Sequence, residues 1–142
     1  MTGRLRATAL GAALLLASGC GLFGDSGLGT LVAFQKLDGF SFSIQAAELD
    51  AGQQPADVFV ALRSFVRLRS EAVVIVPPLA EDTRRFAFIE GGCNHDSAQL
   101  VVVDNVLDVE LLEDGSTEQQ TYCGGITYFL TVFDVPTGHV PQ

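Results

Sequence analysis

Segments in which apolar and polar residues alternate most constrain the fold of this chain. In Val106–Leu112, apolar side chains alternate with the acidic Asp108 and Glu110. A period of two residues places the apolar set on one face of a β-strand and the polar set on the other. The preceding segment Leu100–Val103 is apolar, and Asp104-Asn105 between the two is typical of a tight turn. The pattern predicts an antiparallel hairpin with one buried face.

Other short segments bounded by Gly, Pro, Asn or Asp are also predicted to be strands: Thr30–Lys36, Phe40–Ala46, Val73–Val76, Arg85–Glu90 and Gly125–Val135. The first two flank Leu37-Asp38-Gly39 and are expected to pair as a hairpin. The alternation in the second predicts one buried face, formed by Phe40, Phe42, Ile44 and Ala46. Glu48–Pro55 is expected to be a loop. About seven short strands indicate an all-β, mainly antiparallel fold, a small β-sandwich or barrel.

The segment Ala56–Glu71 fits two structures. One apolar stripe has helical spacing, with Arg63 and Arg67 on the opposite side. The same segment also fits a strand at Val58–Leu62 followed by a turn. We expect the strand first and then a second strand or one short helix near 63–71.

The N-terminal residues have the three parts of a signal peptide. Arg4 and Arg6 supply positive charge, Ala7–Leu16 is apolar, and small residues follow. An apolar core of this length is shorter than the roughly 20 residues that span a bilayer, so a secretory signal is favoured over a membrane helix.

The run Leu14-Leu15-Leu16-Ala17-Ser18-Gly19-Cys20 resembles the lipobox of bacterial lipoproteins. The resemblance implies lipidation of Cys20, cleavage before it and an extracytoplasmic protein anchored to a bacterial membrane. The alternative is ordinary cleavage near Ala17. The C-terminal half (FAFIEGGCN, LVVVDNVLDVEL and CGGITYFLTVFDVP) resembles small envelope lipoproteins of high-GC bacteria.

Cleavage before Cys20 would divide the chain into a signal peptide (1–19), a flexible Gly-rich tether (20–29) and a single β domain (30–142). All 17 acidic residues follow Cys20, whereas two of the eight basic residues precede it. The mature chain would therefore have 6 basic and 17 acidic residues, a net charge of −11. Nucleic acid is excluded as a partner, because its binding requires clustered Lys and Arg. We expect a monomer without a cofactor.

With Cys20 assigned to lipid, Cys93 and Cys123 remain. Two cysteines outside the cytoplasm predict a disulfide. Adjacent glycine pairs would allow the backbone to bring the two together. The alternative is an envelope zinc or copper site formed by Cys93, His95 and Cys123, whose side chains are ligands of these metals.

Five arginines lie between residues 63 and 85: Arg63, Arg67, Arg69, Arg84 and Arg85. Gathered on one surface, they would form a contact for lipid headgroups or for an acidic envelope protein. The competing interpretation is intramolecular pairing with the acidic C-terminal strands.

One short motif, Asn94-His95-Asp96-Ser97, contains the residue types of a hydrolase site. Neighbours on a strand or turn point apart, however, and catalytic groups must converge. The chain contains no P-loop, H-E-x-x-H or G-x-S-x-G motif. We therefore expect a non-catalytic lipoprotein that binds a partner protein or a small ligand, with the metal-binding protein as the alternative.

Overall fold

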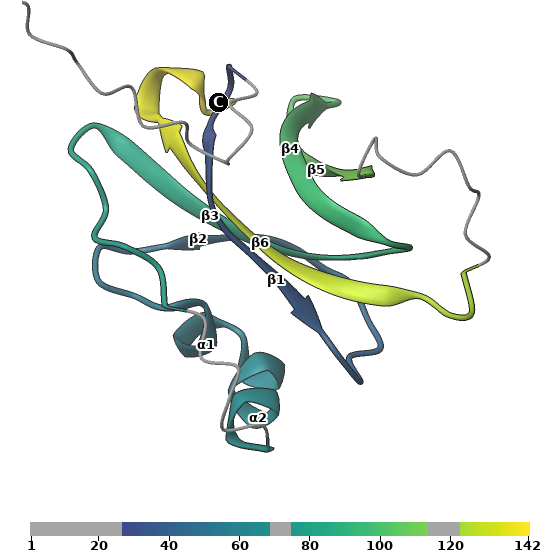
Figure 1. Cartoon of the computed structure of the whole chain (residues 1–142). Helices are drawn as coiled ribbons and strands as arrows, with labels where there is room; N and C mark the ends of the chain where they lie inside the picture. Colours follow the sequence, from purple (N-terminus) through teal and green to yellow (C-terminus); the bar gives the residue numbers. More distant parts are fainter. Residues whose placement is uncertain (1–26, 69–74, 114–122) are drawn as a thin grey trace, which may run out of the picture.

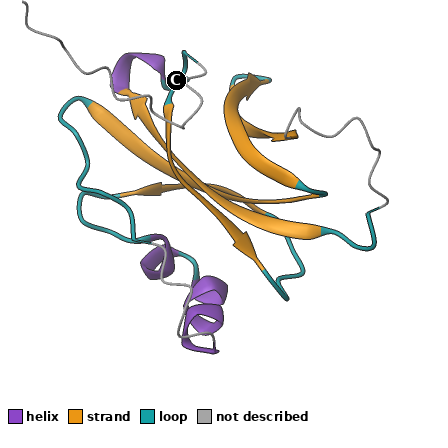
Figure 2. Cartoon of the chain, in the orientation of Figure 1, coloured by secondary structure: helices purple, strands orange, loops and turns teal. Residues whose placement is uncertain are grey.

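The computed structural model describes residues 27–68, 75–113 and 123–142. These residues form six strands in two antiparallel sheets, two short α-helices and a 3-10 turn (Figures 1 and 2). The elements are β1 (Thr30–Leu37), β2 (Ile44–Leu49), α1 (Pro55–Val58), α2 (Val60–Leu68), β3 (Thr83–Gly92), β4 (His95–Val103), β5 (Val106–Glu113), β6 (Thr127–Pro136) and η1 (Thr137–His139). The prediction of an all-β, mainly antiparallel fold is confirmed.

The larger sheet has the strand order β1-β6-β3-β2, and every neighbouring pair in it is antiparallel. β3 and β6 occupy the centre, and each buries five consecutive residues, Arg85–Ile89 and Phe129–Phe133. A strand buried on both faces reads as a nearly continuous apolar run, and these two segments are apolar except for Arg85 and Thr131. The helices cover one face of this sheet and the β4–β5 hairpin covers the other (Figure 1).

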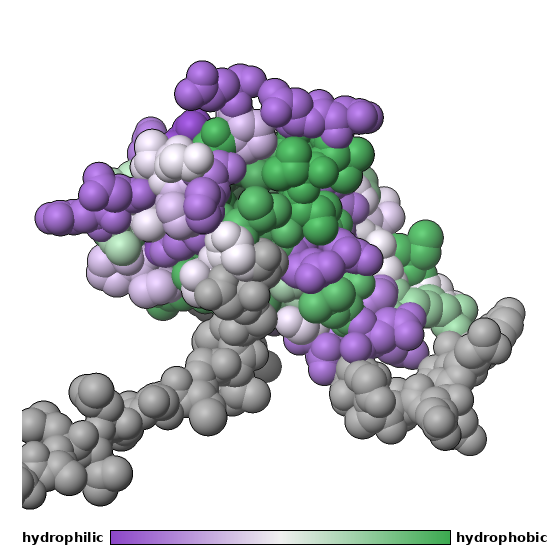
Figure 3. Space-filling view, turned by 90° about the horizontal axis from the view of Figure 1, so that it is seen from above, coloured by the Kyte–Doolittle hydropathy of each residue, from purple (hydrophilic) through white to green (hydrophobic). Residues whose placement is uncertain are grey.

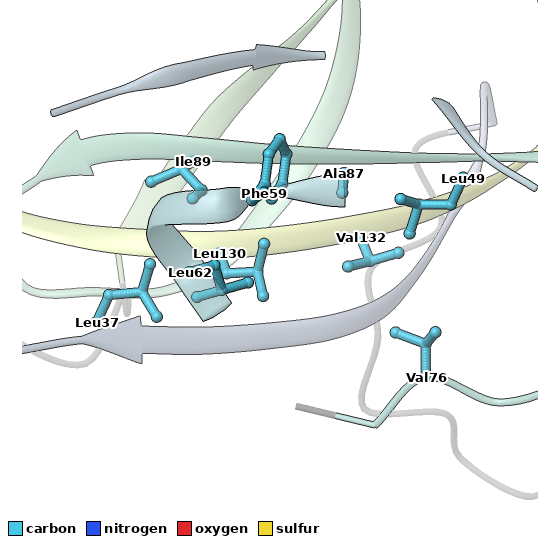
Figure 4. Close-up of a cluster of buried hydrophobic side chains, with 9 residues drawn as sticks. All are labelled: Leu37, Leu49, Phe59, Leu62, Val76, Ala87, Ile89, Leu130 and Val132. Carbon is cyan, nitrogen blue, oxygen red and sulfur yellow. The ribbon is translucent and has the colours of Figure 1, made fainter. Parts of the chain in front are cut away.

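Each face of the central sheet has its own hydrophobic core. The core on the helix side consists of Leu37, Leu49, Phe59, Leu62, Val76, Ala87, Ile89, Leu130 and Val132 (Figure 4). The core on the hairpin side consists of Leu31, Phe86, Phe88, Ala98, Leu100, Leu107, Phe133 and Val135. Odd-numbered residues of β3 thus face the helices and even-numbered residues face the hairpin, as the alternation of side chains along a strand requires.

The predicted hairpin at residues 100–112 is confirmed as β4–β5. Val103 pairs with Val106 across the turn. Asp104 and Asn105 both have positive φ, 50° and 65°. This conformation matches the right-handed twist of the flanking strands and is tolerated by Asp and Asn. Leu107 is buried and Asp108 is exposed, as the alternation predicts.

The prediction of a hairpin between the first two strands is wrong. A turn is present at Asp38-Gly39, where Gly39 has φ 77°. β1, however, pairs with β6, whereas β2 pairs with β3, so the two strands lie at opposite edges of the sheet. β3 and β6 are apolar on both faces and gain most from the central positions, which leaves the half-polar strands at the edges.

The predicted buried face of Phe40–Ala46 is also only partly present. β2 begins at Ile44, and its register with β3 shifts between Ile44 and Ala47. An extra residue in a strand reverses the side chains that follow it. Ala47 and Leu49 therefore face the helix-side core in place of Ala46, and Phe42 is 46% exposed.

Residues 55–58 and 60–68 are helical, separated by the extended Phe59, so the strand predicted at Val58–Leu62 is wrong. Pro55 opens α1 at a position where its missing N–H costs nothing. Gln54 and Asp57 form a reciprocal capping box, with the Asp57 carboxylate 2.9 Å from the Gln54 N–H. The apolar stripe of helical spacing packs against the sheet through Leu62. The short helix expected near 63–71 is thus present in its described part, and residues 69–71 lie outside the described residues.

The strand predicted at Val73–Val76 is not found in its described part, Ile75 and Val76, which is loop. The Val76 N–H donates to the Gln54 side-chain oxygen at 2.9 Å, and its side chain is buried. Val76 therefore fills the helix-side core without joining a sheet. In the described part of the chain, no helix has the length and apolar character needed to cross a membrane.

Candidate functional site

A groove lies between the edge strand β2 and the turn of the β4–β5 hairpin. Its larger part has a volume of about 420 Å³ and is lined by Gln45, Ala46, Glu90, Val103, Asp104, Val106, Leu107 and Asp108. A second hollow of about 260 Å³ shares Ala46, Val106 and Leu107 with it and extends to Arg84, Phe86, Asn105, Val140 and Pro141. Because the two share these three residues, we treat them as one site and name it the hairpin groove.

Exposed valines form the rim of the hairpin groove. Val103 is 50% exposed and Val106 is 61% exposed, and the neighbouring Val102 is 43% exposed. Apolar surface gathers on this side of the molecule in the view from above (Figure 3). Large apolar side chains that remain exposed together mark interaction sites more often than scattered ones do.

Three carboxylates, those of Glu90, Asp104 and Asp108, also line the hairpin groove. Burial raises the pKa of the Glu90 carboxyl above its ordinary value of 4.5, and the nearby Asp108 carboxylate raises that pKa further. Hydrogen bonds with Ser43 and with the Gly91 backbone act in the opposite direction. Both effects that raise the pKa act against the charged form, so a cation or hydrogen-bond donor at this position would relieve them.

The positive charge at the other end of the groove is already compensated. Arg84 donates from Nε and Nη2 to the two carboxylate oxygens of Glu48, at 2.7 and 2.6 Å. Its guanidinium also lies 5.3 Å from the ring centroid of Phe86. The hydrogen bond from Arg84 holds the pKa of the Glu48 carboxyl below its ordinary value. The hairpin groove therefore presents apolar surface and negative charge to a ligand.

The five arginines do not share one surface. Arg63 and Arg67 are exposed on α2, and Arg63 donates to the carbonyls of Ala56 and Asp57. Arg84 lies on the opposite face of the sheet, beside Phe86. Arg69 lies outside the described residues. The described arginines therefore do not form a common basic face. Arg84 and Arg85 are consecutive residues of β3, so their side chains point to opposite sides of the sheet.

Arg85 is not a surface residue but part of a buried ion pair. It is 3% exposed, and its Nε and Nη2 donate to the two oxygens of Asp134 at 2.5 and 2.7 Å. Arg85 and Asp134 are direct partners in the β3–β6 register. A third donor of Arg85 binds the carbonyl of Pro77. The surface contact that the sequence allows for Arg85 is therefore wrong. Arg85 instead pairs with Asp134 of the C-terminal strand β6.

The Cys93–Cys123 disulfide is present, with the two Cα atoms 5.8 Å apart. It joins the chain just after β3 to the chain just before β6, next to the paired residues Gly92 and Thr127. Both sulfurs are therefore bonded to each other and cannot serve as thiolate ligands. The ring of the adjacent His95 packs edge-on against Phe129, with centroids 5.9 Å apart. No cluster of metal-ligating side chains occurs within the described ranges, so the zinc or copper set of Cys93, His95 and Cys123 is not assembled there.

Cys20, the predicted lipidation site, lies outside the described residues, as does the predicted tether up to residue 26. The last residues assigned to the tether are part of the folded domain. Leu28 packs against the hairpin-side core, and Gly29 is buried beside Leu100.

The hairpin groove was not expected from the sequence. Its only local sign is the run Val101-Val102-Val103 followed by Val106, which departs from alternation at the turn. The sequence pattern assigns Asp108 to the polar face of a strand and Asp104 to a turn, so neither carboxylate indicates a binding site. Comparison of the chain with protein-family models, with characterised proteins and with solved structures found no match.

Proposed function

We propose that this chain is a lipid-anchored extracytoplasmic lipoprotein whose β domain is a non-catalytic binding module, with the hairpin groove as its ligand site. The observation that carries the proposal is the groove itself. It is concave, and its walls combine apolar side chains with polar ones that include three carboxylates. Ligand sites of proteins combine these features.

The proposed compartment is supported by the distribution of cysteines. Cys20 follows a charged and then an apolar segment, as in exported lipoproteins. The other two cysteines form a disulfide, which persists in oxidising compartments outside the cytoplasm. Lipid on Cys20 would carry two acyl chains, and two chains hold a protein stably at a bilayer where one does not.

The chemistry of the groove supports binding of an apolar ligand that also bears a positive charge. Ala46 and Val106 contribute apolar surface to both hollows. Glu90 and Asp108 supply negative charge, while Glu48 neutralises Arg84. Such a ligand would replace water over the valines and compensate the two carboxylates.

Site-specific photo-crosslinking in native membranes tests the groove. A benzophenone amino acid at Ala46, inside both hollows, is compared with the same amino acid at Val60, which is 77% exposed on α2. We expect a defined adduct, identified by mass, from position 46 and none from position 60. The adduct should weaken when Val106→Asp is added. Equal labelling at both positions, or none at position 46, contradicts the proposed site.

Intact-mass measurement tests the anchor. The protein extracted from membranes should begin at Cys20 and carry the mass of its acyl chains, and Cys20→Ser should release the protein into the soluble fraction. A Cys20→Ser protein that stays in the membrane as fully as the wild type contradicts lipid anchoring.

A further inference from the structure

The domain has one end at which the described chain begins and ends. Thr30, the first residue of β1, pairs with Asp134, and Thr83 at the start of β3 pairs with Pro136. The Leu28 carbonyl lies 3.4 Å from Nδ1 of His139 in η1. We call this the entry end of the domain; in Figure 1 it lies at the top, beside the C-terminus.

The turn of the β4–β5 hairpin lies at the same end. The Asn105 side chain donates to the carbonyl of the C-terminal residue Gln142 at 2.9 Å. Val140 and Pro141 line the groove together with Val106. The exposed valines around this turn, which we name the valine tip, are Val102, Val103 and Val106. The valine tip is thus next to the place where the chain enters the domain.

The α2 helix lies at the opposite end. β1 runs eight residues from Thr30 to Leu37, and Leu37 packs with Leu62 of α2 in the helix-side core. At roughly 3.3 Å per residue, β1 separates the entry end from α2 by about 26 Å. The exposed residues of α2, including Val60 and Arg67, therefore belong to the end far from the point of entry.

The length of chain before the domain limits how it can sit on a membrane. Six residues lie between Cys20 and Gly27, the first described residue, so seven Cα-to-Cα steps join the two. Even fully extended, they span at most about 25 Å. As a flexible chain they would span about 15 Å. A lipid on Cys20 would therefore hold the entry end against the bilayer surface and keep α2 away from it.

We propose that the valine tip lies in the interfacial layer of the membrane that receives the Cys20 lipid, so that the bilayer covers the apolar rim of the hairpin groove. This inference rests on the proposed lipid anchor and names the surface that the exposed rim contacts. Asp104 at the turn and Asp108 beside it make this surface acidic, which matches the ammonium groups of zwitterionic lipids and is repelled by anionic ones. The lipid surface is therefore zwitterionic.

Single-tryptophan reporters test this orientation, because the chain contains no tryptophan. The full lipidated chain with Val103→Trp is reconstituted in phosphatidylcholine vesicles that contain brominated phosphatidylcholine as a quencher. The matched control is Val60→Trp on α2, which is more exposed than Val103 in the folded domain. Val106→Trp reports on the same surface if Val103→Trp does not fold.

We expect the tryptophan at position 103 or 106 to emit at shorter wavelength and to be quenched at least twofold more than that at position 60. Replacing half of the lipid with phosphatidylglycerol should reduce the difference. Chains that do not float with the vesicles contradict the anchor itself. Chains that float but show equal quenching at 103, 106 and 60 overturn the inference and leave the anchor standing. A blue shift that appears only after membrane proteins are added also overturns it, because a protein then covers the valine tip.

Discussion

Removal of the Asp134 carboxylate tests how much burial increases the contribution of an ion pair to the stability of this domain. Asp134→Ala leaves the Arg85 guanidinium, 3% exposed, with the Pro77 carbonyl as its one remaining partner among the described residues. The adjacent pair Arg84–Glu48 has nearly the same bidentate geometry, but its side chains are 40% and 43% exposed. Glu48→Ala is therefore a matched control, since it also removes one carboxylate that faces an arginine of β3.

The expected magnitudes follow from burial. Breaking a buried ion pair costs about 3–5 kcal/mol, because an uncompensated charge stays in a medium of low dielectric constant. Exposed pairs contribute about 0–1 kcal/mol, because water and salt already solvate the partners. Asp134→Ala should therefore remove a large share of the roughly 5–15 kcal/mol by which small domains are stable. The double substitution Arg85→Met with Asp134→Leu should restore most of that loss, since it leaves no buried charge.

Urea unfolding of the four proteins at constant pH and salt measures these differences as free energies of unfolding. Similar losses for Asp134→Ala and Glu48→Ala would refute the reasoning. So would a double variant that is no more stable than Asp134→Ala. Either result means that Arg85 reaches water or another partner when Asp134 is absent.

Three further predictions concern the disulfide, the groove and one buried hydroxyl. Replacing Cys93 and Cys123 with Ser should lower the free energy of unfolding by about 3.6 kcal/mol, from the chain entropy of a 30-residue loop; an unchanged urea midpoint contradicts this. The raised pKa of Glu90 means that ionisation of this carboxyl lowers the free energy of unfolding. This destabilisation is absent below the ordinary pKa of 4.5, grows as the pH rises towards the folded-state pKa, and is fully present above it. Glu90→Gln should therefore raise the melting temperature at pH 7 but not at pH 4, and Asp108→Asn should do so more weakly; equal effects at both pH values argue against this origin. Thr131 is fully buried and its hydroxyl has no hydrogen-bond partner among the described residues, so Thr131→Val should stabilise the domain by about 1 kcal/mol in urea unfolding, whereas destabilisation would point to an unseen partner.

Local patterns were sufficient for the β4–β5 hairpin, but not for the bounds and register of β2 or for the groove between them. The alternation of Val106–Leu112 and the turn at Asp104-Asn105 correctly identify the β4–β5 hairpin. That the hairpin then folds over β2, and brings Asp108 near Glu90, depends on the bend at Cys93-Asn94 between β3 and β4. Periodicity describes one strand at a time, so it carries no information about contacts across such a bend.

The arginines show that sequence patterns also fail to predict which charged residues act together. Arg84 and Arg85 are neighbours in sequence, and the sequence allows either one basic surface that contains both or their pairing with acidic residues of the C-terminal strands. Their side chains point to opposite faces of β3: Arg84 pairs with exposed Glu48, whereas buried Arg85 pairs with Asp134, whose side chain is 14% exposed. Burial separates their roles, and burial is settled only when β6 lies beside β3.

By itself, the sequence of this protein determined the class of fold, the strands β3 and β6 and the β4–β5 hairpin, because each follows from local periodicity and turn residues. It predicted the Cys93–Cys123 bond only together with the assignment of Cys20 to lipid, which leaves two cysteines to pair. Only the tertiary structure decided the order β1-β6-β3-β2, the helices on one face and the groove on the other. The reason is that alternation assigns each side chain to a face of its own strand. The neighbours of a strand are chosen by the apolar area that the whole sheet can bury.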